Sequence, residues 1–220
     1  MSYDPFEYIE KNLQEWPEGI DPIRDVVRSY EPTNPGRLIA LLCSTDEIIS
    51  QRGLAIFGEL GKKAFGVLDY ALALVQHRNA NAKSHLLDGV LSYPPKLTAI
   101  QLSAILVLLE DSEALIRSKM VTVLATVETD TLSEAISQIP EMVIRSEHQS
   151  GFQYFLNPEL DAQAVFDRSL SASFIQCGYM LASLERRVRD GVELQIPKYV
   201  GDSFVHESLL FQLRRIARKN

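Results

Sequence analysis

Apolar residues recur every three or four positions between residues 46 and 140, which is the spacing of one buried face along a helix. The pattern occurs three times: the second copy follows the first after 33 residues, and the third follows the second after 34 residues. The first copy is Ile49, Gly53, Ile56, Phe57 and Leu60, the second is Ala82, Leu86, Gly89, Val90 and Tyr93, and the third is Ile116, Met120, Val123, Leu124 and Val127. Every position is apolar or small in all three copies, so the segment is predicted to be an internal repeat of amphipathic helices.

Polar positions repeat with the same period. Asp46, Asn79 and Glu113 occupy the predicted helix start, where a polar or acidic side chain suits the free N–H groups and the positive end of the helix dipole. In the third copy, Asp111 and Ser112 are alternative caps. A second shared position, six residues further on, holds a basic side chain in each copy: Arg52, His85 and Lys119.

A second helix is predicted after each first one. Its apolar positions are Leu68, Ala71, Leu72 and Val75, then Leu102, Ile105, Leu106 and Leu109, then Leu132, Ala135, Ile136 and Ile139. The hinges within the pairs are short and contain helix breakers or capping residues: 61–63, 94–96 and 128–130. Because two short helices cannot bury their apolar faces alone, neighbouring pairs are expected to stack.

This arrangement resembles the HEAT-type α-solenoids, in a short-repeat variety, over about 95 of the 220 residues. The resemblance implies an all-α fold, a superhelix of stacked antiparallel helix pairs. The alternative is a non-repetitive helical bundle. We expect one domain over residues 1–220, with N-terminal cap helices in 1–44, three HEAT-like pairs in 45–141 and divergent C-terminal helices in 142–220.

The flanks carry their own helix signals. Asp4-Pro5 and Asp21-Pro22 each place a capping residue before a proline, a favoured helix start. Beyond Pro140, residues 147–151 are predicted to be a polar break. The aromatic cluster of Phe152, Tyr154 and Phe155 is interpreted as core or end-cap packing, because no basic residues alternate with it as in a nucleotide-stacking platform. A further amphipathic helix is predicted over 170–188 and a last one over 205–216.

Charge and composition narrow the function. The net charge is −7 with 46% apolar residues, and no run approaches the 18 apolar residues typical of a membrane span. An acidic chain with no dominant basic face is atypical of nucleic-acid binding. The two cysteines, Cys43 and Cys177, lie in apolar stretches and form no CxxC motif, so they are interpreted as buried free thiols. Residues 1–5 show neither the basic start nor the apolar run of a secretory signal. We therefore expect a cytoplasmic location and no contact with membranes.

No catalytic or metal-binding motif appears in the sequence. HExxH, GxSxG, GxxxxGK[ST] and GxGxxG are all missing, and we assign no catalytic residue, cofactor or metal. Residues 146–148 and 206–208 each place Ser, Glu and His side by side, but adjacent residues point in different directions. Some HEAT-like proteins are DNA glycosylases of similar size, which hold DNA in a basic groove. The predicted second-helix face of this chain is neutral to acidic, without a cationic track.

The leading hypothesis is therefore a non-enzymatic protein that binds a basic protein partner. Several toxin-immunity families resemble a short helical solenoid of this kind, so the concrete expectation is an immunity protein that neutralises a basic, nuclease-type bacterial toxin. A generic HEAT-repeat adaptor fits the same features, and a glycosylase-type nucleic-acid enzyme is the alternative from another class. The candidate partner-binding residues are Glu7, Glu10, Glu15, Trp16 and Glu18 in the N-terminal cap and Asp69, Gln76, Ser103, Glu110 and Ser137 on the second helices.

Overall fold

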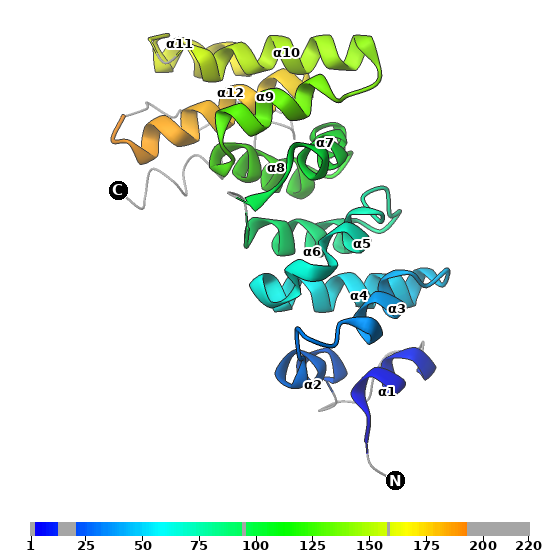
Figure 1. Ribbon diagram of the computed structural model, residues 1–220. Coiled ribbons are helices and arrows are strands. Elements are labelled where there is room, and N and C mark those ends of the chain that lie inside the picture. The colour runs from blue at the N-terminus through cyan, green and yellow to red at the C-terminus, as the bar shows by residue number, and fades with distance from the viewer. Residues whose placement is uncertain (1–2, 13–20, 94–95, 158, 193–220) are drawn as a thin grey trace. The chain divides into compact units, whose positions relative to one another are not determined.

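Every regular element is helical in the part of the chain that the computed structural model describes, residues 3–12, 21–93, 96–157 and 159–192 (Figure 1). The elements are α1 (Pro5–Lys11), α2 (Pro22–Ser29), α3 (Gly36–Leu42), α4 (Glu47–Leu60), the 3-10 helix η1 (Gly61–Val67), α5 (Leu68–Leu72), α6 (Ala80–Leu91), α7 (Ala99–Leu106), the 3-10 helix η3 (Val107–Glu110), α8 (Ala114–Thr126), α9 (Thr129–Ser137), α10 (Met142–Leu156), α11 (Ala162–Ser169) and α12 (Phe174–Arg189). None of these helices is long and apolar enough to cross a membrane. The all-α class predicted from the sequence is thus confirmed for these residues.

The chain divides into two compact units, residues 1–93 and 94–220, each described below by itself. The single-domain organisation stays a prediction. The predicted apolar stripes form the cores of both units. All members of the three first-helix stripes are buried except Ile49, and all members of the second-helix stripes except Val75, which are both half-buried.

The predicted helix starts recur in the structure. Asp46, Asn79 and Glu113 are the N-cap residues of α4, α6 and α8. The side chains of Asp46 and Asn79 each accept two backbone N–H groups of the first turn, whereas Glu113 makes no such bond. In the third copy the Asp111 carboxylate accepts a hydrogen bond from the backbone N–H of the N-cap residue, Glu113, at 2.9 Å.

A second repeated device lies two residues before each cap. The cap N–H donates to Ser44 Oγ in the first copy, at 3.2 Å, and to His77 Nδ1 in the second, at 3.1 Å. The Asp111 contact is its third instance. Three chemically different side chains therefore accept the cap N–H at the start of the equivalent helix in each copy. For this reason no shared residue type marks the position in the sequence.

In the first unit, α4 packs along α6, and α2 and α3 pack against α4. The α4–α6 approach is close because glycines lie between the helices. A Cβ at Gly58 would meet the backbone oxygen of His85 at 2.8 Å, and one at Gly89 would meet the Phe57 ring at 2.1 Å. Gly61 ends α4 with a φ of 48°, a conformation that favours glycine. The close α4–α6 contact therefore requires glycine at positions 58 and 89, because a Cβ at either position would clash with the other helix.

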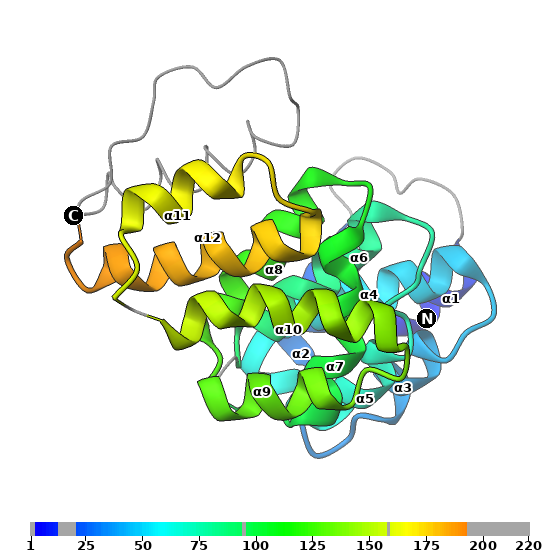
Figure 2. The ribbon, with the colours of Figure 1, turned by 90° about the horizontal axis from the view of Figure 1, so that it is seen from above.

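In the second unit, α12 is the central element and packs against α8, α10 and α11 (Figure 2). Helices α7 and α9, the predicted second helices of two successive pairs, pack on each other, and α9 also contacts α10. Two glycines again allow close packing: a Cβ at Gly151 would meet the Tyr179 ring at 2.7 Å, and one at Gly178 would meet Leu109 Cδ2 at 2.7 Å.

The sequence interpretation of the region after Pro140 was wrong in three respects. The expected polar break at 147–151 is part of the continuous helix α10, because His148 and Gly151 turn inward against Tyr179. Helix α11 was not predicted. The helix predicted from Leu170 begins at Phe174, after the N-cap Ser173, and Leu170 is the C-cap of α11. The helix expected over 205–216 lies outside the described residues.

The interpretation of the aromatic cluster as packing agrees with the structure. Phe152 is buried, and its ring stacks on Phe155 with centroids 6.0 Å apart. Phe155 meets the Tyr179 ring edge to face and carries the Arg186 guanidinium over its own ring, 4.5 Å from the centroid. The cluster therefore joins α10 to α12.

Candidate protein-binding site

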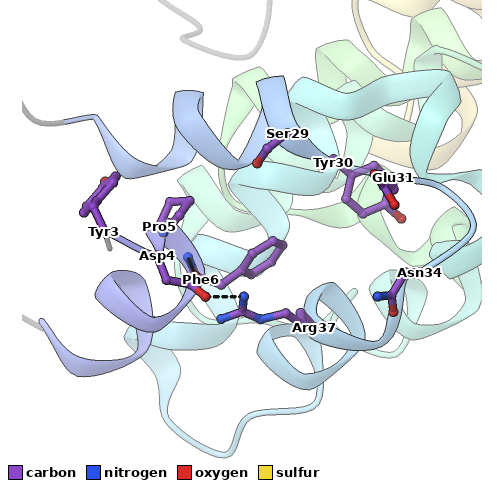
Figure 3. Close-up of a pocket in the computed structure, with 9 residues that line it drawn as sticks. All are labelled: Tyr3, Asp4, Pro5, Phe6, Ser29, Tyr30, Glu31, Asn34 and Arg37. Carbon is purple, nitrogen blue, oxygen red and sulfur yellow. Dashed lines mark hydrogen bonds and ion pairs between the residues drawn. The ribbon is translucent and has the colours of Figure 1, made fainter. Parts of the chain in front are cut away.

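The first unit contains an open pocket of about 320 Å³ between the start of α1, the end of α2 and the start of α3. Figure 3 shows its side chains converging from these three segments. The lining residues are Tyr3, Asp4, Pro5, Phe6, Ser29, Tyr30, Glu31, Asn34 and Arg37. The volume falls in the range of small-molecule and side-chain binding sites, and the wall combines aromatic rings with a few charged groups, as such sites usually do.

Asp4 holds the pocket together. Its Oδ1 accepts the backbone N–H groups of Phe6 and Glu7 and so caps α1. Its Oδ2 accepts the Nη1–H of Arg37 at 2.7 Å, across 33 residues of sequence (Figure 3). The Arg37 hydrogen bond is the main reason why the pKa of Asp4 is lowered. Both carboxylate oxygens of Asp4 thus accept hydrogen bonds from the protein. The role of Asp4 is therefore to hold the start of α1 and the Arg37 side chain in place in the pocket wall.

Arg37 is fixed on a second side by Phe6, whose ring centroid lies 4.6 Å from the guanidinium carbon, a cation–π contact. The hydrogen bond to Asp4 raises the pKa of Arg37, so the side chain stays charged. Within the described residues no acceptor faces its Nε and Nη2 groups. Arg37 thus has a defined orientation and unused donors.

Acidic side chains surround this pocket. Glu31 lines it and is exposed, and no hydrogen bond or ion pair within the described residues involves its carboxylate. Glu7 and Glu10 are exposed on α1, and Glu7 forms an ion pair with Lys11. The pKa of Tyr3 is raised by burial and by the hydrogen bond and negative charge of Asp25. The local field therefore favours a cation over an anion.

The predicted partner-binding residues divide between the two units. Glu7 and Glu10 lie beside the pocket, and Glu15, Trp16 and Glu18 fall outside the described residues. In the first unit, Asp69 is exposed on α5 and Gln76 is exposed in the turn after it; in the second unit, Glu110 and Ser137 are exposed and Ser103 is half-buried on α7. The role of all ten residues in binding stays a prediction.

Sequence reasoning missed the pocket itself. Phe6 and Tyr30 belong to the segments predicted to be helical after Asp4-Pro5 and Asp21-Pro22, and neither residue was predicted to bind a ligand or partner. The one available signal was Asp4, which the sequence marked as a helix cap. Its second partner, Arg37, could not be found from spacing because a contact between two different helices leaves no periodic trace.

Several arginines are directed at the backbone. Arg186 donates to the carbonyl oxygens of Leu124, Ala125 and Val127 at the end of α8 and to Thr129 Oγ1. Four other arginines likewise donate to backbone carbonyls at helix ends or in the connections between helices: Arg52 to Ile9 and Asn12, Arg117 to Asp111 and Ser112, Arg145 to Ile139 and Pro140, and Arg187 to Asn157 and Leu160. Of these five arginines, Arg117 is buried and the other four are half-buried.

Many carboxylates, in contrast, point to solvent. The exposed acidic residues of the described part include Glu7, Glu10, Glu31, Glu47, Glu59, Asp69, Glu110, Glu128, Asp130, Glu134 and Glu141. Exposed acidic side chains outnumber exposed Lys and Arg side chains in the described part of the chain, so its surface is acidic, as the net charge of −7 implies.

A serine–histidine contact occurs in the first unit, where Ser50 Oγ lies 3.4 Å from His77 Nε2. The other ring nitrogen, Nδ1, accepts the backbone N–H of Asn79, so it carries no proton and Nε2 is the N–H donor. An Nε2–H group cannot remove the Ser50 proton, and Ser50 is only 3% exposed. This geometry serves the helix junction and does not activate the hydroxyl.

The residues of 146–148 bond to different partners. His148 is buried, and its Nδ1 lies 2.9 Å from the Tyr179 hydroxyl. The neighbouring carboxylate of Glu147 accepts the Ser173 hydroxyl at 3.0 Å. Burial lowers the pKa of His148 to about 4. The Ser, Glu and His of 206–208 lie outside the described residues.

The cysteines differ from one another. Cys177 is buried and its pKa is raised to about 12 by that burial, whereas Cys43 is exposed, contrary to the prediction of two buried thiols. Among the described residues no three His, Cys, Asp or Glu side chains gather closely enough to hold a metal ion. Comparison with protein families, with curated proteins and with solved structures finds no match.

Proposed function

We propose that this protein binds a basic protein partner without catalysing a reaction, and most concretely that it is an immunity protein that neutralises a basic, nuclease-type toxin. The observation that carries the proposal is the acidic surface: among the described residues, exposed carboxylates outnumber exposed Lys and Arg side chains, and five arginines bond to backbone carbonyls. An acidic surface accelerates encounter with a basic partner and orients it before contact.

The pocket between α1, α2 and α3 is the proposed docking point in the first unit. It is concave, its walls are held by the Asp4–Arg37 bond, and Glu7, Glu10 and Glu31 surround it. A shaped site inside an acidic field can provide both a fast approach and a specific fit.

A short-repeat HEAT-like solenoid is the architecture that we infer for residues 45–141. Support comes from the equivalent caps at Asp46, Asn79 and Glu113, from the repeated bond to each cap N–H, and from the packing of α4 on α6 and of α7 on α9 within their own units. Stacked pairs of this kind expose their second helices as a continuous contact surface.

The proposal is tested by capture and kinetics with the full chain. The immobilised protein should retain one basic protein from cells of its source, and a neighbouring gene for a large protein with a basic domain would identify the partner independently. Changing Glu7, Glu10, Glu15 and Glu18 to Gln should slow association at low salt at least tenfold, because steering by charge is lost. An unchanged association rate would exclude the N-terminal cap as the docking surface.

A matched control removes the same charge from the other unit, with Glu128, Glu134, Glu141 and Glu159 changed to Gln. This variant should retain most of the association rate if docking occurs at the N-terminal cap. Duplex DNA is the probe for the nucleic-acid enzyme alternative, which requires binding that falls steeply as salt rises. No DNA binding at low salt is expected.

A further inference from the structure

We propose that the pocket between α1, α2 and α3 receives a single lysine or arginine side chain of the partner, with the side-chain cation at Glu31 and the adjoining main-chain carbonyl at Arg37. This inference rests on the proposed function and names the group that the pocket recognises. It is drawn from the polar groups of the wall that remain unused and from the rings between them.

The carboxylate of Glu31 is the group in the pocket wall that can bind a cation. Asp4, the other acid in the wall, already accepts bonds at both oxygens. Glu31 is exposed at the end of α2, and the described residues give its carboxylate no partner. A carboxylate in an acidic neighbourhood, with no cation assigned to it, selects a positively charged group.

Arg37 provides N–H donors that can bind an acceptor of the ligand. Its Nη1 is bonded to Asp4 and its face lies over Phe6, so the guanidinium is held in one orientation. The Nε and Nη2 groups are left without an acceptor among the described residues. An anion would meet repulsion from Glu10 and Glu31, whereas a neutral carbonyl oxygen would not. A peptide carbonyl is therefore the complementary acceptor.

Aromatic side chains form the surface between Glu31 and Arg37. The rings of Phe6 and Tyr30 line the pocket there, as Figure 3 shows, and burial raises the pKa of Tyr30, which keeps its hydroxyl neutral. Lysine and arginine carry an apolar stem that packs on such rings while the charged head stays at a polar rim. One basic residue of a peptide has all three matching groups: a main-chain carbonyl for Arg37, an apolar side-chain stem for the rings and a cation for Glu31.

The test uses N-acetyl-L-arginine amide as the probe and N-acetyl-L-citrulline amide as its uncharged match. Amide and side-chain chemical shifts of the full chain are followed by NMR during titration. The arginine compound should bind with a dissociation constant on the order of 1 mM, and the largest shifts should fall at Phe6, Tyr30, Glu31, Asn34 and Arg37. The citrulline compound should bind about tenfold more weakly, because it lacks the charge for Glu31.

The matched variants are Glu31→Gln and Glu59→Gln, which each neutralise one exposed carboxylate of the first unit. Glu31→Gln should weaken arginine amide binding about fivefold, and Glu59→Gln should leave it unchanged. Equal binding of the arginine and citrulline compounds, shifts spread over other helices, or an unaffected Glu31→Gln variant would each overturn the inference. The ligand comparison on the unmodified chain requires no variant to fold.

The inference and the proposed function fail in different ways. If the chain captures a basic partner and Glu31→Gln captures it equally well, the protein binds its partner elsewhere and the pocket inference is wrong. If the arginine amide binds as expected but no basic protein is captured, the chemistry of the pocket is supported and the proposed function is not.

Discussion

Both units pack helices closely at glycines, but the second unit adds more hydrogen bonds from side chains to its central contacts. In the first unit the α4–α6 contact relies on glycines, with Gly58 against the His85 backbone and Gly89 against the Phe57 ring. In the second unit α8, α10 and α11 pack against α12, which has close contacts at Gly151 and Gly178 and also hydrogen bonds from the buried Tyr179 and the half-buried Arg186. The α12 contacts therefore combine close approach with hydrogen bonds between side chains and neighbouring helices.

The two units also differ in how an arginine stacked on a phenylalanine is used. In the second unit, Arg186 lies over Phe155 and donates to three carbonyl oxygens, so it is part of the core structure. In the first unit, Arg37 lies over Phe6 in the same manner, but it is only partly used and borders a pocket. The same kind of cation–aromatic pair therefore lies within the helix contacts of one unit and in the wall of an open pocket in the other.

The largest effect is expected from Arg186→Ala. The substitution leaves the carbonyls at the end of α8 without their donor and removes the cation from Phe155, so unfolding free energy should fall by about 4 kcal/mol. Urea unfolding followed by circular dichroism measures the change. Arg186→Lys should lie in between, because one ammonium cannot reach all the acceptors. The exposed Arg168→Ala is the control and should change stability by less than about 0.5 kcal/mol.

The buried His148 should make stability depend on pH. Its pKa is about 4 in the fold against an ordinary value of 6.5, because burial disfavours the charged ring. Between these values the unfolded chain binds a proton that the folded chain does not, so stability is lost as pH falls from 6.5 to 4 and is unaffected by this group above 6.5. The loss should reach about 3 kcal/mol.

The same unfolding series on His148→Gln isolates this contribution from that of the carboxylates. The variant should be less stable near neutral pH, because the bond to the Tyr179 hydroxyl changes, and its stability should fall less between pH 6.5 and 4. Parallel curves for the variant and the unmodified protein would show that His148 is not protected from protonation.

The glycine contact in the first unit is tested by Gly58→Ala. The added Cβ would lie 2.8 Å from the His85 oxygen, and α4 would have to move from α6, at a cost of about 2 kcal/mol. Gly66→Ala is the matched control, since a Cβ there meets nothing within 4 Å. It should be neutral or should stabilise the protein slightly by restricting the unfolded chain. Thermal unfolding of both variants distinguishes packing from helix propensity.

The smallest effect concerns Asp4. Asp4→Ala removes the cap of α1 and the partner of Arg37, and Asp21→Ala removes a cap alone. Each cap should contribute about 1 kcal/mol. A double-mutant cycle with Arg37→Ala should give a coupling below about 1 kcal/mol, because both side chains are partly exposed. A larger coupling would mean that the pocket wall is part of the folding core.

The local sequence determined much of the helical structure. The caps at Asp4, Asp21, Asp46 and Asn79 begin helices as expected, because capping depends on residues only two or three positions away. The apolar stripes of the repeat are buried because their period matches the helix. These features depend on neighbours along the chain, so periodicity and residue type are sufficient to find them.

Only the tertiary structure decided the rest. Residues 147–151 appear polar in the sequence, yet they continue α10 because Tyr179, 31 positions from His148, provides the buried hydrogen bond and fills the space above Gly151. The Asp4–Arg37 pair and the pocket arise in the same way, from residues of different helices. A hydrogen bond or a steric gap between distant residues has no period and no local signature, so it exists only once the helices have packed.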